Sequence, residues 1–285
     1  MTPFGFVIIV LVSIVSYLIG SINLSIILSK LLGKGDIRDY GSKNAGTTNT
    51  LRVLGKGPAL VVFIWDVLKG VIAVWLVRAV VGWLGIPGAE ENAPFDYNLV
   101  YSLGIMIASI AVILGHNYPA FFGFKGGKGV ATSLGVLLAI ELRIGLICLA
   151  AGIVGIAIFQ FVSVGSLIAA IEYPILICII GGHFDRVLDS SIQIRVTYII
   201  FSFILSLMVI YRHRANIERI KNGTENKLRF KKTVEEKIAE EKEKYQVNTE
   251  SPSIEVNNEV KEDNEDNVDV NPIQEEQKKN KKKKN

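Results

Sequence analysis

The chain has 285 residues, of which 50% are hydrophobic, and its 31 Lys and Arg against 27 Asp and Glu give a net charge of +4. Several apolar runs reach the roughly 20 residues that an α-helix needs to cross a bilayer, so the composition excludes an ordinary soluble protein. The two cysteines, Cys148 and Cys178, lie in apolar runs, which excludes a disulfide framework and a cysteine metal cluster.

Seven apolar stretches predict seven transmembrane helices and therefore an all-α membrane protein. They cover roughly residues 4–31, 58–83, 99–118, 128–141, 144–161, 163–182 and 194–211. The first lacks the basic start and the cleavage pattern of a secretory signal, so we expect it to be retained. The fourth is short for a helix that must cross ~30 Å, so we expect it to be tilted or sheltered by its neighbours.

The charges of the loops predict the orientation in the membrane. Lys and Arg gather in loop 33–57 and in residues 212–232, and loop 119–127 holds Lys125 with Lys128 at its edge. Loop 84–98 carries acidic residues and no Lys or Arg. Because Lys and Arg near the ends of spans stay in the cytoplasm, the N-terminus is predicted to lie outside and the C-terminus in the cytoplasm.

The last part of the chain differs in composition from the rest. Residues 231–285 contain 12 basic and 15 acidic residues, which leaves 19 basic and 12 acidic residues in the first 230. With few large apolar residues to bury, residues 233–285 are predicted to be a charged, disordered cytoplasmic tail. Residues 1–232 form the predicted membrane domain, whose positive charge suits anionic lipids or anionic substrates.

The first cytoplasmic loop, "GDIRDYGSKNAGTTNTLRVLGKGPA", is rich in hydroxyl, amide and glycine residues. Its short polar side chains include Ser42, Asn44, Thr47 and Asn49, and Arg52 follows close behind. A guanidinium can contact an anion through two N–H groups while hydroxyls and backbone N–H groups complete the shell. The loop therefore indicates an anion pocket, and the alternative is a loop that only caps its two neighbouring spans.

A second basic loop reads "KGGKGVAT" and leads into the fourth apolar stretch. Gly126, Gly127 and Gly129 would let successive N–H groups point into one concavity at a helix N-terminus, where Lys128 adds a full charge. The loop is not a nucleotide-binding Walker A motif, because glycine and no hydroxyl residue follows Lys128. A positively charged loop whose glycines serve close packing is the alternative.

The third polar segment, "YRHRANIERIKNGTENK", follows the seventh stretch. His213 and Asn216 are three residues apart and would share a face if the helix continues beyond the bilayer. All three polar segments fall on the predicted cytoplasmic side, which favours one site built from them. We interpret His116, in "GHNYP", as part of a turn that ends a span.

The sequence resembles a known family. The segments "GSINLS", "DIRDYGSKNAGTTNTLR", "GHNYPAFFGFKGGKGVATSLG", "FVSVGSL" and "RHRANIERIKNGTE" are similar, in order, to bacterial acyl-phosphate:glycerol-3-phosphate acyltransferases. The resemblance covers residues 1 to about 230. It implies a multi-pass enzyme of the cell membrane that acylates the 1-hydroxyl of glycerol 3-phosphate from acyl phosphate. The products would be lysophosphatidic acid and phosphate, in the first acylation of phospholipid synthesis.

The resemblance also implies roles for single residues, in an active site that faces the cytoplasm. The expected catalytic residues are Ser42, Arg52, Lys128, His213 and Asn216. The expected phosphate-binding residues are Gly126, Gly127, Gly129, Asn44, Thr47 and Asn49, and Glu225 is expected to support them. No metal or cofactor is implied, and the expected partners are the two substrates and membrane lipids, without nucleic acid.

The chemistry of acyl phosphate fits these residue types. Acyl phosphate is a mixed anhydride with a good leaving group, so the enzyme has mainly to bind two phosphates, orient a hydroxyl and stabilise developing charge. Direct attack is favoured over a covalent intermediate on Ser42, because no triad is visible. The alternative function is a transporter or channel for an organic phosphate, for which Glu172 is the one suspicious carboxylate in mid-span.

Overall fold

The computed structural model describes residues 3–84, 95–184 and 192–228, which are helices joined by loops and turns. The long helices are α1 (Pro3–Ser21), α4 (Lys56–Trp83), α5 (Phe95–Asn117), α7 (Leu142–Phe159), α8 (Val162–Phe184) and α10 (Ile192–Arg212). The short ones are α2 (Leu24–Leu31), α3 (Thr47–Val53), α6 (Val130–Ile140) and α11 (Arg214–Lys221), with 3₁₀ turns η1 (Ile37–Asp39) and η2 (Ala120–Phe122). No β-strand occurs in the described residues, so the all-α prediction is confirmed.

Six segments in the described part of the chain are long and apolar enough to cross a membrane. They are Gly5–Leu31, Lys56–Val81, Tyr101–Phe122, Leu142–Phe159, Val162–Ile180 and Ile194–Arg212. The expected fourth span is the exception, because α6 has 11 residues. At 1.5 Å per residue such a helix is only about 16 Å long, roughly half the thickness of the hydrocarbon core.

The first apolar stretch, expected as one continuous helix, is interrupted. α1 ends at Ser21, and Asn23 begins the separate helix α2 by accepting a hydrogen bond from the Ile26 N–H at 3.2 Å. The Asn23 side chain also donates to the Ala45 carbonyl at 3.1 Å. The break therefore joins the end of the first span to the polar loop that follows it.

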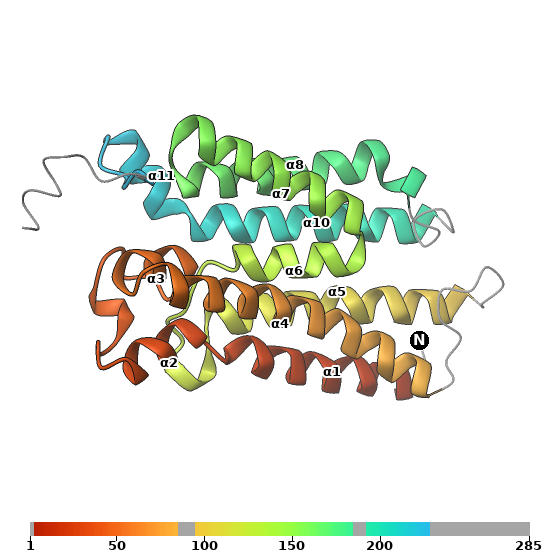
Figure 1. The fold of residues 1–285 in the computed structure, drawn as a ribbon. Coiled ribbons are helices and arrows are strands. Elements are labelled where there is room, and N and C mark those ends of the chain that lie inside the picture. Colours follow the sequence, from red (N-terminus) through yellow and green to blue (C-terminus); the bar gives the residue numbers. More distant parts are fainter. Residues whose placement is uncertain (1–2, 85–94, 185–191, 229–285) are drawn as a thin grey trace, which may run out of the picture. The chain divides into compact units, whose positions relative to one another are not determined.

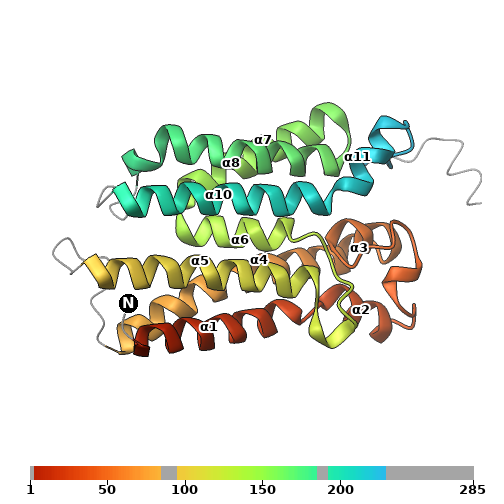
Figure 2. The ribbon, with the colours of Figure 1, turned by 180° about the vertical axis from the view of Figure 1, so that it is seen from behind.

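The helices form two groups with α6 between them (Figures 1 and 2). Helices α1, α4 and α5 lie on one side of α6, and α7, α8 and α10 lie on the other. The short helices α2, α3 and α11 gather at one end of these groups, and the start of α1 lies at the opposite end. The polar segments that were expected to meet are thus placed at the same end.

Glycines allow neighbouring helices to pack closely in the α1–α5 and α4–α6 pairs. A Cβ atom added at Gly20 or Gly115 would collide with the backbone of the facing helix in the α1–α5 pair. The same holds for Gly70 and Gly135 in the α4–α6 pair. Small residues at helix crossings are typical of membrane proteins, where association depends on close van der Waals packing.

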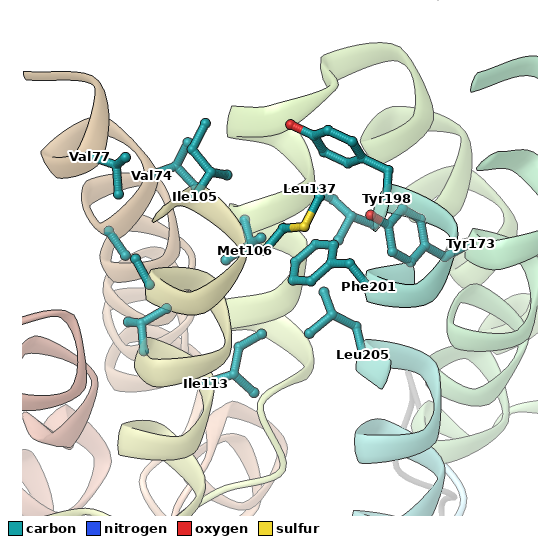
Figure 3. Packing of buried hydrophobic residues seen from close by; sticks show 14 of the residues in the cluster. Val74, Val77, Ile105, Met106, Ile113, Leu137, Tyr173, Tyr198, Phe201 and Leu205 are labelled. Atoms are coloured by element: carbon teal, nitrogen blue, oxygen red, sulfur yellow. The ribbon is translucent and has the colours of Figure 1, made fainter. Parts of the chain in front are cut away.

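The apolar core joins both groups across α6 (Figure 3). Ile105 and Met106 of α5, Leu137 of α6 and Tyr198 and Phe201 of α10 belong to one cluster of buried side chains. Large apolar side chains also cover the outside of the helices, as expected where lipid is the solvent. Most of the acidic loop 84–98 and the whole predicted tail, residues 233–285, lie outside the described residues.

Candidate functional site

A cavity of about 290 Å³ reaches from the polar end of the helices into the space between α6, α7, α8 and α10. Its polar side chains include most of the residues that sequence analysis singled out: Ser42, Asn44, Thr47, Arg52, Lys128, His213, Asn216 and Glu225. Gly129 lines it as well, whereas Asn49, Gly126 and Gly127 do not. The structure therefore brings the three polar segments of the sequence to one cavity.

Asn49 organises the first loop through three hydrogen bonds. Its side-chain oxygen accepts a hydrogen bond from the Ser42 N–H at 2.8 Å. Its amide nitrogen donates to the carbonyls of Ile37 at 3.0 Å and Tyr40 at 3.1 Å. All of these partners belong to the loop, so Asn49 holds Ser42 in place, and Asn49 is not among the residues that line the cavity.

Thr47 and Arg52 face the cavity from α3. The hydroxyl of Thr47 is buried without a hydrogen-bond partner among the described residues. The pKa of Arg52 is lowered, mainly by burial, although a guanidinium still keeps its proton at neutral pH. A buried hydroxyl without a partner, on the same helix as an arginine that lines the cavity, is an arrangement that an anionic ligand would complete.

Two glycines of the basic loop, Gly126 and Gly127, donate their backbone N–H groups to the end of α5. The N–H of Gly126 donates to the Asn117 carbonyl at 3.1 Å, and that of Gly127 donates to the His116 carbonyl at 3.0 Å. A Cβ atom added at Gly127 would collide with the His116 ring. Gly126 and Gly127 thus fasten the loop to the end of α5, and their N–H groups are already used.

The N-terminus of α6 takes over the place of the expected N–H cradle. Gly129 begins the helix with φ 79°, and Gly129, Val130 and Ala131 line the cavity. The first N–H groups of a helix have no acceptor within it, and its dipole places partial positive charge there. Ser133 lines the cavity on the next turn, and its hydroxyl is buried without a partner in the described part of the chain.

Lys128 is held by a chain of polar side chains that ends at Glu225. Its Nζ donates to Asn216 Oδ1 at 2.5 Å, and Asn216 Nδ2 donates to Glu225 Oε1 at 2.6 Å. Glu225 also accepts hydrogen bonds from Ser163 at 3.0 Å and from Arg219 at 2.7 Å. This carboxylate therefore fixes which way the Asn216 amide points, and so presents an oxygen to Lys128.

The pKa values of these groups reflect their burial and their partners. Burial lowers the pKa of Lys128 to about 8, while the charge of Glu225 acts to raise it and nearby arginines act to lower it. Burial alone would raise the pKa of Glu225, but hydrogen bonds from Asn216, Arg219 and Ser163 outweigh it and lower the pKa. At neutral pH Lys128 is therefore mainly charged and Glu225 is ionised.

His213 is buried between α10 and α11, and its ring carries its hydrogen on Nδ1. Burial and the charge of Lys128 lower its pKa to about 4, so the ring is neutral at physiological pH. Nδ1 lies 2.8 Å from the Val209 carbonyl oxygen, which can only accept, so Nδ1 carries the hydrogen. The lone pair is then on Nε2, which makes His213 a proton acceptor at the cavity.

The inner half of the cavity is apolar. Leu134 and Leu137 of α6, Ile153 of α7, Ala169 of α8 and Leu205 of α10 line it. Gly152 and Gly165 also line it and let α7 and α8 pack closely, because a Cβ atom added at Gly165 would collide with the Gly152 carbonyl oxygen. A site with cationic groups at one end and an apolar slot at the other suits an amphiphile with an anionic head.

Sequence reasoning missed several residues of the site. Arg38 donates to the carbonyls of Phe122 at 2.6 Å and Lys125 at 2.9 Å, and so joins the first loop to the basic loop. Asp66 and His116 also line the cavity. Asp66 could have been noticed in the sequence, because a carboxylate inside an apolar stretch is unusual. The contacts of Arg38 could not, because they depend on the fold.

The chain is similar to a known family of proteins. Residues 10–223 match the family model described as glycerol-3-phosphate acyltransferase. Proteins of that name from Thermoanaerobacter pseudethanolicus and Clostridioides difficile are 43% and 40% identical. The matches cover 77% and 78% of this chain and 95% and 97% of those proteins.

Solved structures of an integral membrane glycerol 3-phosphate acyltransferase, PlsY, are similar as well. The glycerol 3-phosphate form has a TM-score of 0.61 and the lysophosphatidic acid form one of 0.58, each at 33% sequence identity. Both matches cover 77% of this chain and 94% of the other. On the combined evidence of the family model, the curated relatives and the fold, this chain belongs to the glycerol-3-phosphate acyltransferase family.

Proposed function

We propose that the cavity is the active site in which glycerol 3-phosphate is acylated to lysophosphatidic acid, with acyl phosphate as the donor. The observation that carries the proposal is the composition of the cavity. Lys128, Arg52 and the N-terminus of α6 lie at its polar end, and an apolar slot continues from there between α6, α7, α8 and α10. One cavity thus offers sites for two phosphates and for one acyl chain.

The acyl phosphate would lie along this slot with its chain among the helices. Its phosphate then comes to the N-terminus of α6, where N–H groups, Lys128 and the unpartnered hydroxyl of Ser133 converge. The glycerol 3-phosphate would enter from the polar end, where Arg52 and the residues Ser42, Asn44 and Thr47 can hold its phosphate. Binding both substrates side by side orients the hydroxyl toward the acyl carbonyl.

His213 is the group best placed to accept the proton of the attacking hydroxyl. Its ring is neutral with Nε2 unprotonated, and the residue lines the cavity. The hydroxyl oxygen forms the new ester bond to the carbonyl carbon, the bond from that carbon to the phosphate oxygen breaks, and inorganic phosphate leaves. Positive charge at Lys128 stabilises the negative charge that builds up on the departing phosphate.

The topology proposed for the enzyme has seven spans, an outer N-terminus and a cytoplasmic active site. The distribution of Lys and Arg in the loops supports this orientation. α6 would be the fourth and shortest of the seven crossings. It would be sheltered between α1, α4 and α5 on one side and α7, α8 and α10 on the other. Residues 1–232 would form the catalytic domain, and residues 233–285 a tail outside it.

The experiment that tests the function uses the purified full-length chain in detergent with palmitoyl phosphate and glycerol 3-phosphate. We expect lysophosphatidic acid and inorganic phosphate to appear in equal amounts, as mass spectrometry and a phosphate assay would measure. Palmitoyl coenzyme A in place of palmitoyl phosphate is the control and should give no product. Saturable binding of glycerol 3-phosphate without any turnover would contradict the proposal and favour a transporter.

A further inference from the structure

A buried cluster of charged and ionisable side chains lies behind the proposed active site and has no part in the mechanism described so far. It consists of Asp66 and Lys69 of α4 and His116 of α5, with exposed fractions of 3%, 0% and 3%. Charged groups inside membrane helices are costly and usually serve a function. Asp66 and His116 line the cavity, whereas Lys69 lies behind them.

Lys69 uses its ammonium group to join three elements. Its Nζ lies 2.8 Å from Asp66 Oδ1, 2.7 Å from His116 Nδ1 and 3.3 Å from the Gly20 carbonyl oxygen. An ammonium has three hydrogens and no acceptor, so these three acceptors use all of them. The carboxylate of Asp66 compensates the charge that the helices bury.

The contact with Lys69 determines where His116 carries its proton. Nδ1 faces a group that can only donate, at 2.7 Å, so Nδ1 must be the acceptor and the hydrogen must be on Nε2. A hydrogen on Nδ1 would instead point at the ammonium, and the longer distance of 3.3 Å from Nδ1 to Asp66 Oδ1 does not compensate for that conflict. His116 therefore has the tautomer opposite to that of His213.

The Nε2 side of the ring faces the basic loop. A Cβ atom added at Gly127 would collide with Nε2, so this nitrogen is next to the Gly127 backbone. The neighbouring residues Lys128 and Gly129 line the same cavity as His116. On its other side the Gly127 carbonyl accepts from Arg212, which braces the loop against α10.

We propose that His116 is a further hydrogen-bond donor to a substrate phosphate in this cavity, and that Lys69 and Asp66 are positioning residues that hold its proton on Nε2. The inference rests on the proposed function and adds to it one more donor at the same cavity. A phosphate monoester or acyl phosphate accepts hydrogen bonds only, so an imidazole with its proton on the wrong nitrogen could not serve it. The buried ion pair thus has a purpose beyond packing.

The first test compares two replacements of His116 in the purified enzyme. His116→Phe keeps a planar ring without a donor, and His116→Gln places an amide N–H near the former Nε2. We expect kcat/KM to fall about 10- to 150-fold in His116→Phe, the range for loss of a hydrogen bond to a charged group, and Gln to restore much of it. A folded His116→Phe enzyme with wild-type kinetics for both substrates would overturn the proposal.

The KM values show which phosphate His116 contacts. A rise in KM for glycerol 3-phosphate alone assigns the contact to the acceptor substrate, and a rise for palmitoyl phosphate alone assigns it to the donor. Tyr17→Phe is the matched control, because it removes the hydrogen bond from the Tyr17 hydroxyl to the Tyr118 carbonyl, 2.8 Å long, outside the polar site. We expect Tyr17→Phe to keep wild-type KM values.

The tautomer can be measured without turnover. Nitrogen-15 spectra of histidine-labelled wild-type protein in detergent, assigned by the signals lost in His116→Gln and His213→Gln, should show Nε2–H for His116 and Nδ1–H for His213. A hydrogen on Nδ1 of His116 would overturn the inference. Because this experiment needs no substrate, its outcome is separate from that of the proposed function, which fails if the wild-type protein has no turnover.

The role of the ion pair is tested by removing both charges together. Asp66→Asn combined with Lys69→Met leaves no unpaired buried charge, so it avoids the main reason why a single replacement would fail to fold. We expect the folded double variant to lose the fixed Nε2–H tautomer and to resemble His116→Phe in kcat/KM. Wild-type kinetics together with an unchanged tautomer would show that Lys69 and Asp66 do not position His116.

Discussion

Lys128 can bind a phosphate electrostatically only while it keeps its proton. Since burial lowers its pKa to about 8, the charge is present below that pH and is lost as the pH rises through it. We therefore expect kcat/KM to decline above about pH 8. His213, with its pKa lowered to about 4, is already neutral throughout this range and adds no change of its own.

A comparison with Lys128→Arg isolates this ionisation. An arginine side chain stays protonated to much higher pH, so the alkaline decline of a Lys128→Arg enzyme should disappear or move upward, whatever its absolute rate. The measurement is the kcat/KM profile from about pH 6 to about pH 10 for both proteins. An identical alkaline decline in the two enzymes would show that another group is responsible.

Gly127 is a residue whose contribution is expected to be steric. In Gly127→Ala the added Cβ collides with the His116 ring, so the loop or the ring must move. We expect a loss of stability of about 1–3 kcal/mol, as for other overpacked sites, seen as a lower midpoint of thermal unfolding. Gly57→Ala is the control, because a Cβ there meets no atom within 4 Å, and its midpoint should not fall.

For single residues, the chemical type of a site residue could be predicted from the sequence more readily than its contacts. Ser42, Arg52, Lys128, His213 and Asn216 could be proposed from residue type, and all five line the cavity. The structural roles of other residues, such as Asn49 and Gly127, could not be predicted from residue type. For Asn49 and Gly127 they depend on hydrogen bonds and close contacts with partners brought near by folding.

At the scale of helices, α6, α7, α8 and α10 are expected to select the acyl chain. Ala169 of α8 lines the apolar slot, so Ala169→Phe should fill it. We expect the KM for palmitoyl phosphate to rise clearly more than that for octanoyl phosphate, while the KM for glycerol 3-phosphate stays near its wild-type value. Steady-state kinetics with the three substrates would measure this.

Ile171 supplies the matched control for this slot. It lies two residues further along α8, is 51% exposed on the outside of the helices and does not line the cavity. Ile171→Phe should therefore leave all three KM values unchanged. An equal rise for the long and the short acyl phosphate in Ala169→Phe would show that the chain does not follow the apolar slot.

The helices themselves were largely predictable because hydropathy is a local property. Runs of apolar residues indicated the long helices to within a few residues, and the shortness of α6 was visible as well. The break before α2 was not, since it depends on the hydrogen bond from Asn23 to the distant Ala45 carbonyl. A polar residue that binds across a loop leaves no periodic pattern in the sequence.

At the scale of the whole molecule, the proposed orientation can be tested by labelling in intact cells. In a background with Cys148→Ala and Cys178→Ala, we expect Asn92→Cys to react with an impermeant maleimide from outside. Lys34→Cys should react only after the membrane is opened, because the loop that contains it is rich in Lys and Arg. Labelling of both positions in intact cells would contradict the orientation.

We propose that the basic group at the start of α6 acts on a phosphate in the cavity during acyl transfer. The most direct measurement is the rate of lysophosphatidic acid formation by purified wild-type, Lys128→Met and Lys125→Met enzymes under the same conditions. Lys128 lines the cavity and Lys125 does not. We predict that Lys128→Met loses about 30- to 150-fold in rate, the range for one charged hydrogen bond of roughly 2–3 kcal/mol, and that Lys125→Met stays near wild type. A folded Lys128→Met enzyme with the wild-type rate would show that Lys128 does not act on a phosphate during acyl transfer.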